Sequence, residues 1–150
     1  MSPGRVSEIG LLRLVALGLV TGHDEVADAV RHLGAVQGQD LPGALTSLAL
    51  RTARRSREAV VAAFDAGGIV RSWPMRGTLH VVPAEDLGWM LPLGTPRPRA
   101  QAARRRRELG LTDADLERAR ALAVDRVPAT REGLFAAWDE AGLAPAKGRG

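Results

Sequence analysis

The spacing of apolar residues changes once along the chain, from a helical pattern to runs of β-forming residues. This change limits the folds that the chain can adopt. Two short segments rich in β-forming residues, 69–73 and 78–82, flank the sequence Pro-Met-Arg-Gly. Proline supplies the φ that a turn needs, and Gly77 can adopt the positive φ that most residues avoid. The sequence therefore predicts a short β-hairpin over 69–82.

Apolar residues at helical spacing precede this hairpin. We interpret residues 9–20 as a buried first helix of a cytoplasmic protein, because Arg13 interrupts the stretch and a membrane span needs roughly 20 apolar residues. A second helix is expected to be capped by Asp24 and to be stopped by Gly38 and Pro42. A third begins near Pro42, and a fourth follows a cap at Ser56. The residues expected to face the core are Val26, Val30, Leu33, Leu45, Leu48, Leu50, Val60, Val61 and Phe64.

Helices followed by a hairpin occur in this order in a winged helix-turn-helix domain, where the hairpin is the wing. The predicted fold class is thus mainly α with a short hairpin. We assign residues 1–95 to this winged-helix domain, which includes a helix with Glu85 and Asp86 in its first turn. The arginine-rich segment 96–111 is either a linker or an exposed helix.

Residues 112–150 predict two more helices, capped by Thr112 and Thr130. Leu134, Phe135 and Trp138 form one apolar stripe on the last helix, and the sequence offers no evident partner for it. We therefore expect 112–150 to be the incomplete start of a second winged-helix domain in a tandem architecture that is cut short. Fast amide exchange over 130–141 and slower exchange over 69–82 follow from this expectation. In the alternative, the last helix folds back onto the first domain.

Composition excludes some functions and favours others. The chain has no cysteine, which excludes disulfides, thiolate metal sites and a cysteine nucleophile. The net charge of +4 favours a polyanionic partner. The positive charge is almost all arginine, however, as a GC-rich genome would also produce. The run 104–107 is accordingly either a phosphate-binding stripe or a solvated helix face.

A glutamine pair is the main candidate for chemistry. Gln37 continues the spacing of Val30 and Leu33, which would place it on the apolar face of the second helix. An extended chain after Gly38 would bring Gln39 to the same side. Because a buried amide without partners costs roughly 1–3 kcal/mol, two of them at one place need a reason. Alternatively, both cap local backbone groups or lie in solvent. Asp40 could add negative charge or act as a base, although the alternation points it away.

The hairpin offers candidate DNA contacts. Arg71 and Arg76 can pair with phosphates. Such contacts fix the position of the protein on the DNA without recognising the base sequence. Thr78 and His80 project from the same face of the second strand, although His80 also suits a hydrogen-bonded structural role. The histidines show no ligand constellation, so the sequence predicts no metal site. We also expect no cofactor.

Four sequence segments occur in a specific order and separation: Gln-Gly-Gln-Asp at 37–40, Pro-Gly-Ala at 42–44, the hairpin at 69–80, and Glu-Asp-Leu at 85–87. Together they resemble the N-terminal part of winged-helix DNA glycosylases of the AlkZ/YcaQ type. The resemblance implies tandem winged-helix domains on double-stranded DNA and a monofunctional enzyme that removes alkylated or crosslinked purines. It also implies that Gln37 and Gln39 form the catalytic motif. The alternative is a non-catalytic winged-helix DNA-binding module, or an inactive gene fragment.

Overall fold

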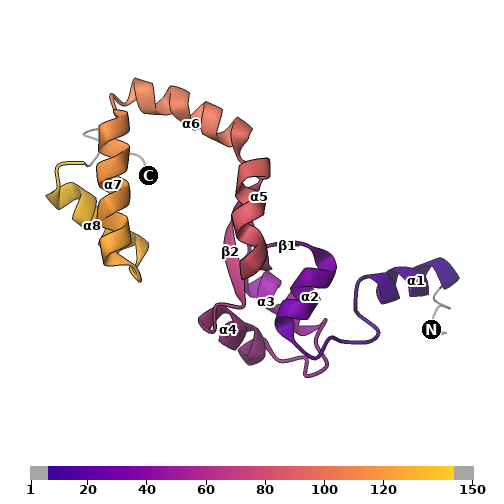
Figure 1. The fold of residues 1–150 in the computed structure, drawn as a ribbon. Coiled ribbons are helices and arrows are strands. Elements are labelled where there is room, and N and C mark those ends of the chain that lie inside the picture. Colours follow the sequence, from indigo (N-terminus) through magenta and orange to yellow (C-terminus); the bar gives the residue numbers. More distant parts are fainter. Residues whose placement is uncertain (1–6, 144–150) are drawn as a thin grey trace. The chain divides into compact units, whose positions relative to one another are not determined.

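The computed structural model of the chain describes residues 7–143, except for the side chains of residues 97 and 98. These residues are mainly helical, with eight α-helices, one short 3-10 helix and one antiparallel sheet of three strands (Figure 1). In chain order the elements are α1 (Glu8–Ala16), α2 (Val26–Leu33), β1 (Val36–Gln37), α3 (Leu41–Ala49), α4 (Arg57–Asp65), β2 (Ile69–Met75), β3 (Thr78–Pro83), η1 (Ala84–Asp86), α5 (Leu87–Gly94), α6 (Pro96–Glu108), α7 (Asp113–Arg126) and α8 (Arg131–Glu140). Within this part of the chain, no helix combines the length and hydropathy of a bilayer span.

The contacts between residues divide the chain into two compact units, Met1–Pro98 and Arg99–Gly150. The boundary falls inside α6. Each unit is described by itself below.

The predicted hairpin is confirmed. Strands β2 and β3 pair in antiparallel fashion from Ile69↔Pro83 to Met75↔Thr78. The turn consists of Arg76 and Gly77, with φ of 52° and 70°. Pro74 was expected in this turn, but it lies buried inside β2, at an irregularity in the register between Ser72 and Met75. A bulge of this kind accommodates a proline because the ladder needs no N–H there.

A third strand, β1, was not expected from the sequence. The second helix ends at Leu33, because Gly34 adopts a φ of 73° and terminates it before Gly38. The chain then extends, and Val36 pairs with Val81 of the central strand β3. Gln37 therefore belongs to a strand, and its predicted place on a helix face was wrong.

Helices α2, α3 and α4 pack with the sheet around the apolar core of the first unit. Its buried residues are Val26, Val30, Ala44, Leu48, Ala49, Val60, Ile69 and Val81. Two predicted core residues are instead exposed, Leu50 by 46% and Val61 by 44%. Ser56 caps α4 as predicted, accepting a bond from the Ala59 N–H at 3.1 Å. Glu25, rather than Asp24, occupies the N-cap position of α2.

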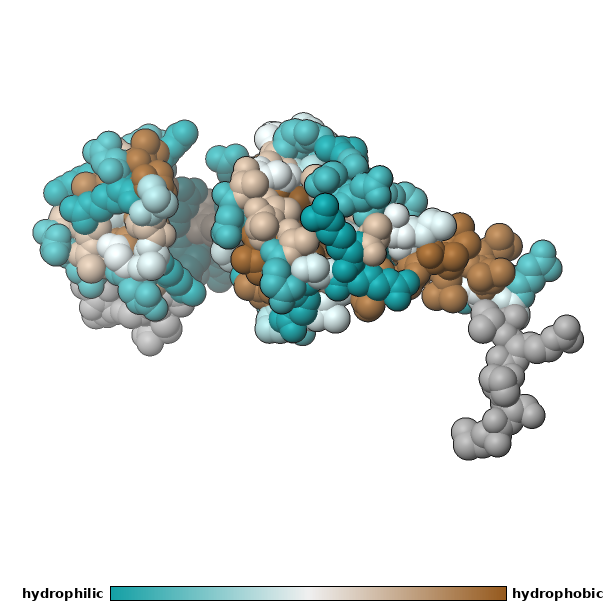
Figure 2. All heavy atoms as spheres, turned by 90° about the horizontal axis from the view of Figure 1, so that it is seen from below, coloured by the Kyte–Doolittle hydropathy of each residue, from teal (hydrophilic) through white to brown (hydrophobic). Residues whose placement is uncertain are grey.

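Helix α1 forms in the first part of the predicted segment 9–20, but it ends before Leu17 and it is not buried. It contains no buried residue, and Ile9 and Leu12 are 64% and 61% exposed. Figure 2 shows hydrophobic side chains gathered over this helix. The helix ends at Ala16, whose carbonyl lies 2.8 Å from Nε2 of His32 on α2. Apolar residues surround the helix on several sides, so the sequence pattern predicts a helix without specifying which face is covered.

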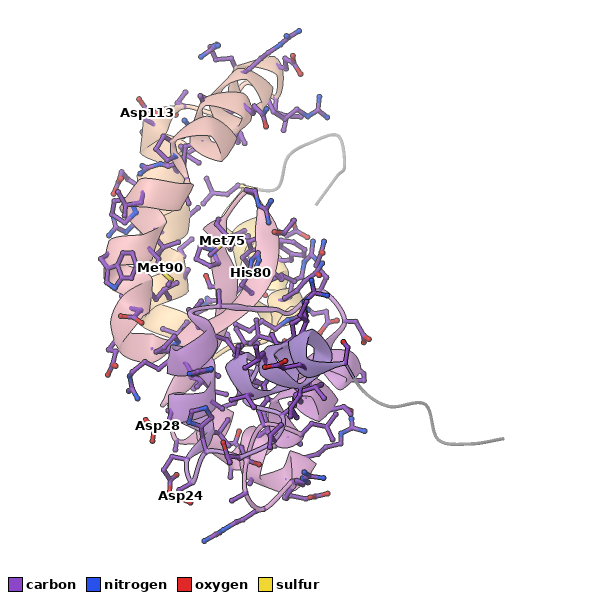
Figure 3. All side chains as sticks on the ribbon, turned by 90° about the vertical axis from the view of Figure 1, so that its right-hand side faces the viewer. Asp24, Asp28, Met75, His80, Met90 and Asp113 are labelled. Carbon is purple, nitrogen blue, oxygen red and sulfur yellow. The ribbon has the colours of Figure 1, made fainter. Side chains whose placement is uncertain are left out.

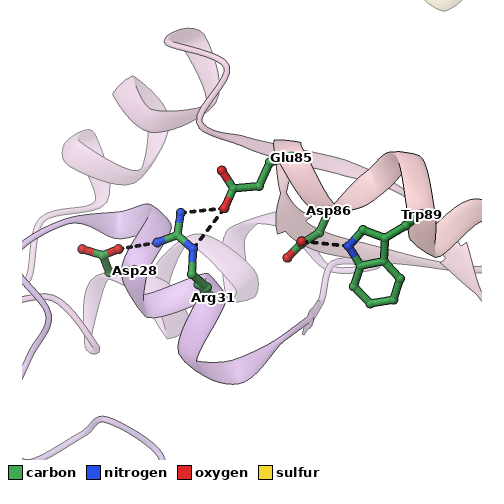
Figure 4. Close-up of polar contacts among 5 residues, drawn as sticks. All are labelled: Asp28, Arg31, Glu85, Asp86 and Trp89. Atoms are coloured by element: carbon green, nitrogen blue, oxygen red, sulfur yellow. Dashed lines mark hydrogen bonds and ion pairs between the residues drawn. The ribbon is translucent and has the colours of Figure 1, made fainter.

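The segment after the hairpin is fixed to both α2 and β2. Arg31 of α2 binds Asp28 and reaches Glu85 of η1 at 2.8 Å, and Trp89 donates to Asp86 at 2.8 Å (Figure 4). At the other end of α5, a Cβ on Gly94 would lie 2.8 Å from the carbonyl carbon of Pro74 and closer still to its oxygen. Helix and strand backbones therefore touch at this point.

In the second unit, the arginine-rich segment is a helix, α6, rather than a linker. Thr112 caps α7 in a capping box with Asp115, as its sequence indicated. Hydrogen bonds from the Thr112 hydroxyl and N–H hold the pKa of the Asp115 carboxyl below its usual value. Within the run 104–107, Arg104 and Arg105 pair with Glu108 at 3.1 and 3.2 Å.

The last helix has a partner inside the chain, which corrects the expectation that its stripe is unpartnered. Thr130 caps α8, and the indole N–H of Trp138 donates to the Ala119 carbonyl of α7 at 3.0 Å. Ala137 is buried, and Leu134 is half-buried. Trp138 and Ala119 are 19 positions apart on two different helices, so the spacing of residues within one helix gave no signal for this contact. Residues 144–150, where the basic end of the sequence falls, lie outside the described residues.

Candidate functional site

The two glutamines of the 37–39 segment meet at the end of β1. The Nε2 of Gln37 donates to the Oε1 of Gln39 at 2.7 Å. The predicted convergence of the two amides is therefore confirmed. It arises from extended backbone rather than from a helix end, and both side chains are exposed instead of buried.

The backbone between the glutamines is held from two sides. The buried Gly38 donates its N–H to the Leu79 carbonyl of β3 at 2.8 Å. Its own carbonyl accepts from Nε of Arg71 at 2.6 Å, and Nη2 of the same arginine reaches the Gln39 carbonyl at 3.3 Å. Arg71 belongs to β2, so the hairpin positions the glutamine segment directly.

A cleft of about 310 Å³ opens beside the glutamines. It is lined by Gln37, Gln39, Asp40, Gly43, Ala44 and Ser47. Asp40 thus shares the cleft with both amides, which corrects the expectation that it points away. A Cβ on residue 43 would come too close to this carboxylate, so glycine lets the Asp40 side chain keep its place without shifting.

Sequence reasoning missed the α3 wall of this cleft, formed by Gly43, Ala44 and Ser47. The signal was present, because the predicted helix start near Pro42 directly follows the glutamine segment. A helix that begins so soon after the motif must lie beside it.

His80 and Thr78 occupy less exposed places than the sequence suggested. His80 is 7% exposed, and its Nδ1 lies 3.0 Å from the Thr78 carbonyl. The strand register sets His80 opposite both Gln37 and Ser72, so these residues form one row across the sheet. Thr78 is half-buried and donates from its hydroxyl to the Met75 carbonyl at 3.4 Å. The geometry favours a structural role for His80.

Arg76 lies exposed at the hairpin tip. Figure 3 shows Asp24 and Asp28, near the start of α2, at the end of the first unit away from Met75 and His80. The hairpin end is therefore separated from these acidic side chains. Across residues 7–143, no group of three or more His, Asp or Glu side chains is arranged to hold a metal ion.

Comparison with known proteins defines the class to which this fold and site belong. The sequence model of the AlkZ-like DNA glycosylases matches residues 30–148, and the chain belongs to this family. The match includes the glutamine segment, the cleft and the hairpin, whereas α1 precedes it.

Among solved structures, the chain is similar to the Streptomyces sahachiroi DNA glycosylase AlkZ, with a TM-score of 0.61 and 26% sequence identity. The similarity covers 83% of this chain and 34% of that protein, so the chain spans about a third of its length. No curated protein matches the sequence.

Proposed function

We propose that the chain is a DNA-binding part of a glycosylase that hydrolyses the N-glycosidic bond of alkylated or crosslinked purines in double-stranded DNA. The observation that carries this proposal is the pair of joined amides, Gln37 and Gln39, at the edge of a cleft inside the family match. The proposed place of action is the cytoplasm.

The order of elements supports a winged-helix assignment for residues 1–95. Helix α2, strand β1, helices α3 and α4 and the β2–β3 hairpin follow one another as in that fold, with the hairpin as the wing. Residues 96–111 then connect this domain to 112–150, which we assign to a second winged-helix domain of a tandem architecture. The greater length of the Streptomyces protein supports a multidomain enzyme.

The proposed chemistry suits amides. A purine alkylated on N7 or N3 is cationic, so it departs with the electrons of the glycosidic bond without a strong acid to protonate it. Water then adds to the sugar carbon, leaving an abasic site, the free base and one proton. The Gln37–Gln39 bond uses one nitrogen and one oxygen, so the Oε1 of Gln37 can accept a hydrogen bond from that water. Positioning of this kind supplies much of an enzymatic rate.

Asp40 adds a negative charge to the same cleft. A carboxylate there counters the positive charge that develops on the sugar, and it can take the proton released from water. We rank its contribution below that of the two glutamines, whose side chains are joined by a hydrogen bond at the edge of the cleft.

The hairpin supplies the proposed DNA contacts. Arg76 at the tip and Thr78 beside it can meet the phosphate backbone, and Arg71 lies nearer the glutamines. His80, the fourth hairpin residue considered for DNA contact, is buried and supports the strand that holds the others. Phosphate contacts fix the position of the protein on the duplex, and each neutralised phosphate steepens the salt dependence of binding.

The first test measures whether the protein, in its natural full length, releases N7-methylguanine from a methylated DNA duplex. We expect free base and an abasic strand, with no release from unmodified DNA as the control. Failure to release base at saturating protein would contradict the enzymatic proposal.

The second candidate function is that of a non-catalytic winged-helix DNA-binding module, or of an inactive fragment. It is favoured by the mutual bond of the glutamines, which satisfies part of their hydrogen-bonding capacity without a substrate. In that case Gln37→Ala and Gln39→Ala leave DNA binding unchanged, and the wild-type protein releases no base.

A further inference from the structure

We propose that Arg71 is a positioning residue, which holds Gln37 and Gln39 in register from the hairpin and links that register to a DNA phosphate. This inference rests on the proposed glycosylase function for its consequence, although the positioning itself can be measured without any activity.

The contacts that carry the proposal converge on Gly38. Its N–H is bound to Leu79 of β3, and its carbonyl is bound to Nε of Arg71 at 2.6 Å. The middle residue of the glutamine segment is thus fixed through both of its backbone groups. The side chains on either side remain exposed to the cleft.

The arginine reaches this segment across the sheet. Arg71 pairs with Val81 of β3, and Val81 pairs in turn with Val36 of β1. Its guanidinium therefore passes over the central strand to the far one. β1 contains only two residues, so its ladder with β3 is short, and hydrogen bonds from a charged donor are stronger than those between neutral groups. Arg71 is accordingly a major anchor of the segment.

The guanidinium keeps donors for a second ligand. Arginine carries five N–H groups in a rigid plane, and the contacts to the Gly38 and Gln39 carbonyls use two of them. The side chain is exposed, so the remaining N–H groups can bind a phosphate oxygen. A phosphate bound there would orient the same guanidinium that holds the backbone between Gln37 and Gln39. DNA binding and the geometry of the glutamine pair are thereby coupled.

Replacing Arg71 by lysine tests the geometry separately from the charge. The lysine ammonium keeps the positive charge but lacks the planar arrangement of N–H donors of the guanidinium. In Arg71→Lys we expect the single-turnover rate of base release at saturating protein to fall about tenfold to a hundredfold, from loss of a charge-assisted bond. The dissociation constant for DNA should change by no more than about twofold, since the positive charge that pairs with the phosphate is retained.

Arg71→Ala should lower both the rate of base release and the affinity for DNA. Arg54→Ala, an exposed arginine of the same unit, is the matched control and should leave both unchanged.

Amide exchange of the DNA-free protein tests the positioning alone. We expect the Gly38 amide to exchange about ten times faster or more in Arg71→Lys and Arg71→Ala. The amides of Leu48 and Val60 in the core should keep their wild-type rates, which shows that the variants fold. Unchanged exchange at Gly38 in both variants would overturn the proposal. Faster exchange in a protein that releases no base would uphold the positioning role and refute the glycosylase function.

Discussion

At the scale of single residues, the tip of the hairpin carries unfavourable backbone. Arg76 has a φ of 52°, in the left-handed region that glycine and asparagine tolerate best. Together with Gly77 it forms a two-residue turn with two positive φ values, for which Asn-Gly is the preferred sequence. Arginine therefore gains no stability from this backbone conformation, and its exposed side chain at the tip is free to meet a phosphate, as proposed above.

Replacing Arg76 by asparagine separates these two roles. We expect Arg76→Asn to raise the free energy of unfolding by up to about 1 kcal/mol, measured by urea denaturation. The same variant should weaken DNA binding and reduce the slope of log affinity against log salt by about one. A variant that is more stable and binds DNA with an unchanged salt slope would show that Arg76 contacts no phosphate.

The residues of the site were partly predictable. Extended backbone after Gly38 brings Gln39 beside Gln37 whichever element precedes it, so the pair was found although the helix was misplaced. The contact of Arg71 was not predictable, because it joins residues 33 positions apart in the sequence. Spacing patterns report neighbours on one element, whereas this contact depends on how two strands are arranged around a third.

At the scale of elements, the contact of α5 with β2 depends on Gly94. A Cβ there would meet the Pro74 backbone, which cannot move aside as a flexible side chain can. We expect Gly94→Ala to destabilise the first unit by about 1–3 kcal/mol or more, as overpacking does. Gly88 on the same helix faces open space, so Gly88→Ala should instead be neutral or stabilise by up to about 1 kcal/mol. Equal effects of the two substitutions on thermal unfolding would contradict the close approach.

Element type was easier to predict than element packing. The hairpin and the capped helices α4, α7 and α8 follow from β-forming runs and from Ser56, Thr112 and Thr130, which are local signals. A two-residue strand such as β1 has no period to detect, and its pairing with β3 is a tertiary contact. The burial of α1 was mispredicted for the same reason, since apolar spacing does not identify a partner surface.

At the scale of the whole molecule, the two units differ in how much they bury. The first has a core that includes Leu48, Val60 and Val81, all fully buried. Among the described residues of the second, 99–143, only Ala137 is buried. Burial of large apolar side chains supplies most of the stability of a domain, so the second unit should be the weaker one.

Native-state amide exchange measures this difference. We expect faster exchange over 130–141 than over 69–82, because local opening costs less where few apolar side chains are buried. The docking of Trp138 on α7 should still slow exchange in α8 relative to the unfolded peptide. Equal, strong protection of both regions would show that the second unit is stabilised by more than its own contacts.

The central claim is that Gln37 and Gln39 act together in base release, and single-turnover release of N7-methylguanine tests it most directly. With protein saturating over methylated duplex, binding does not limit the rate. We predict a large loss in Gln37→Ala and in Gln39→Ala, and little further loss in the double variant, because residues that act as one unit are not additive. DNA affinity should be retained. Release at the wild-type rate by the double variant would contradict the account.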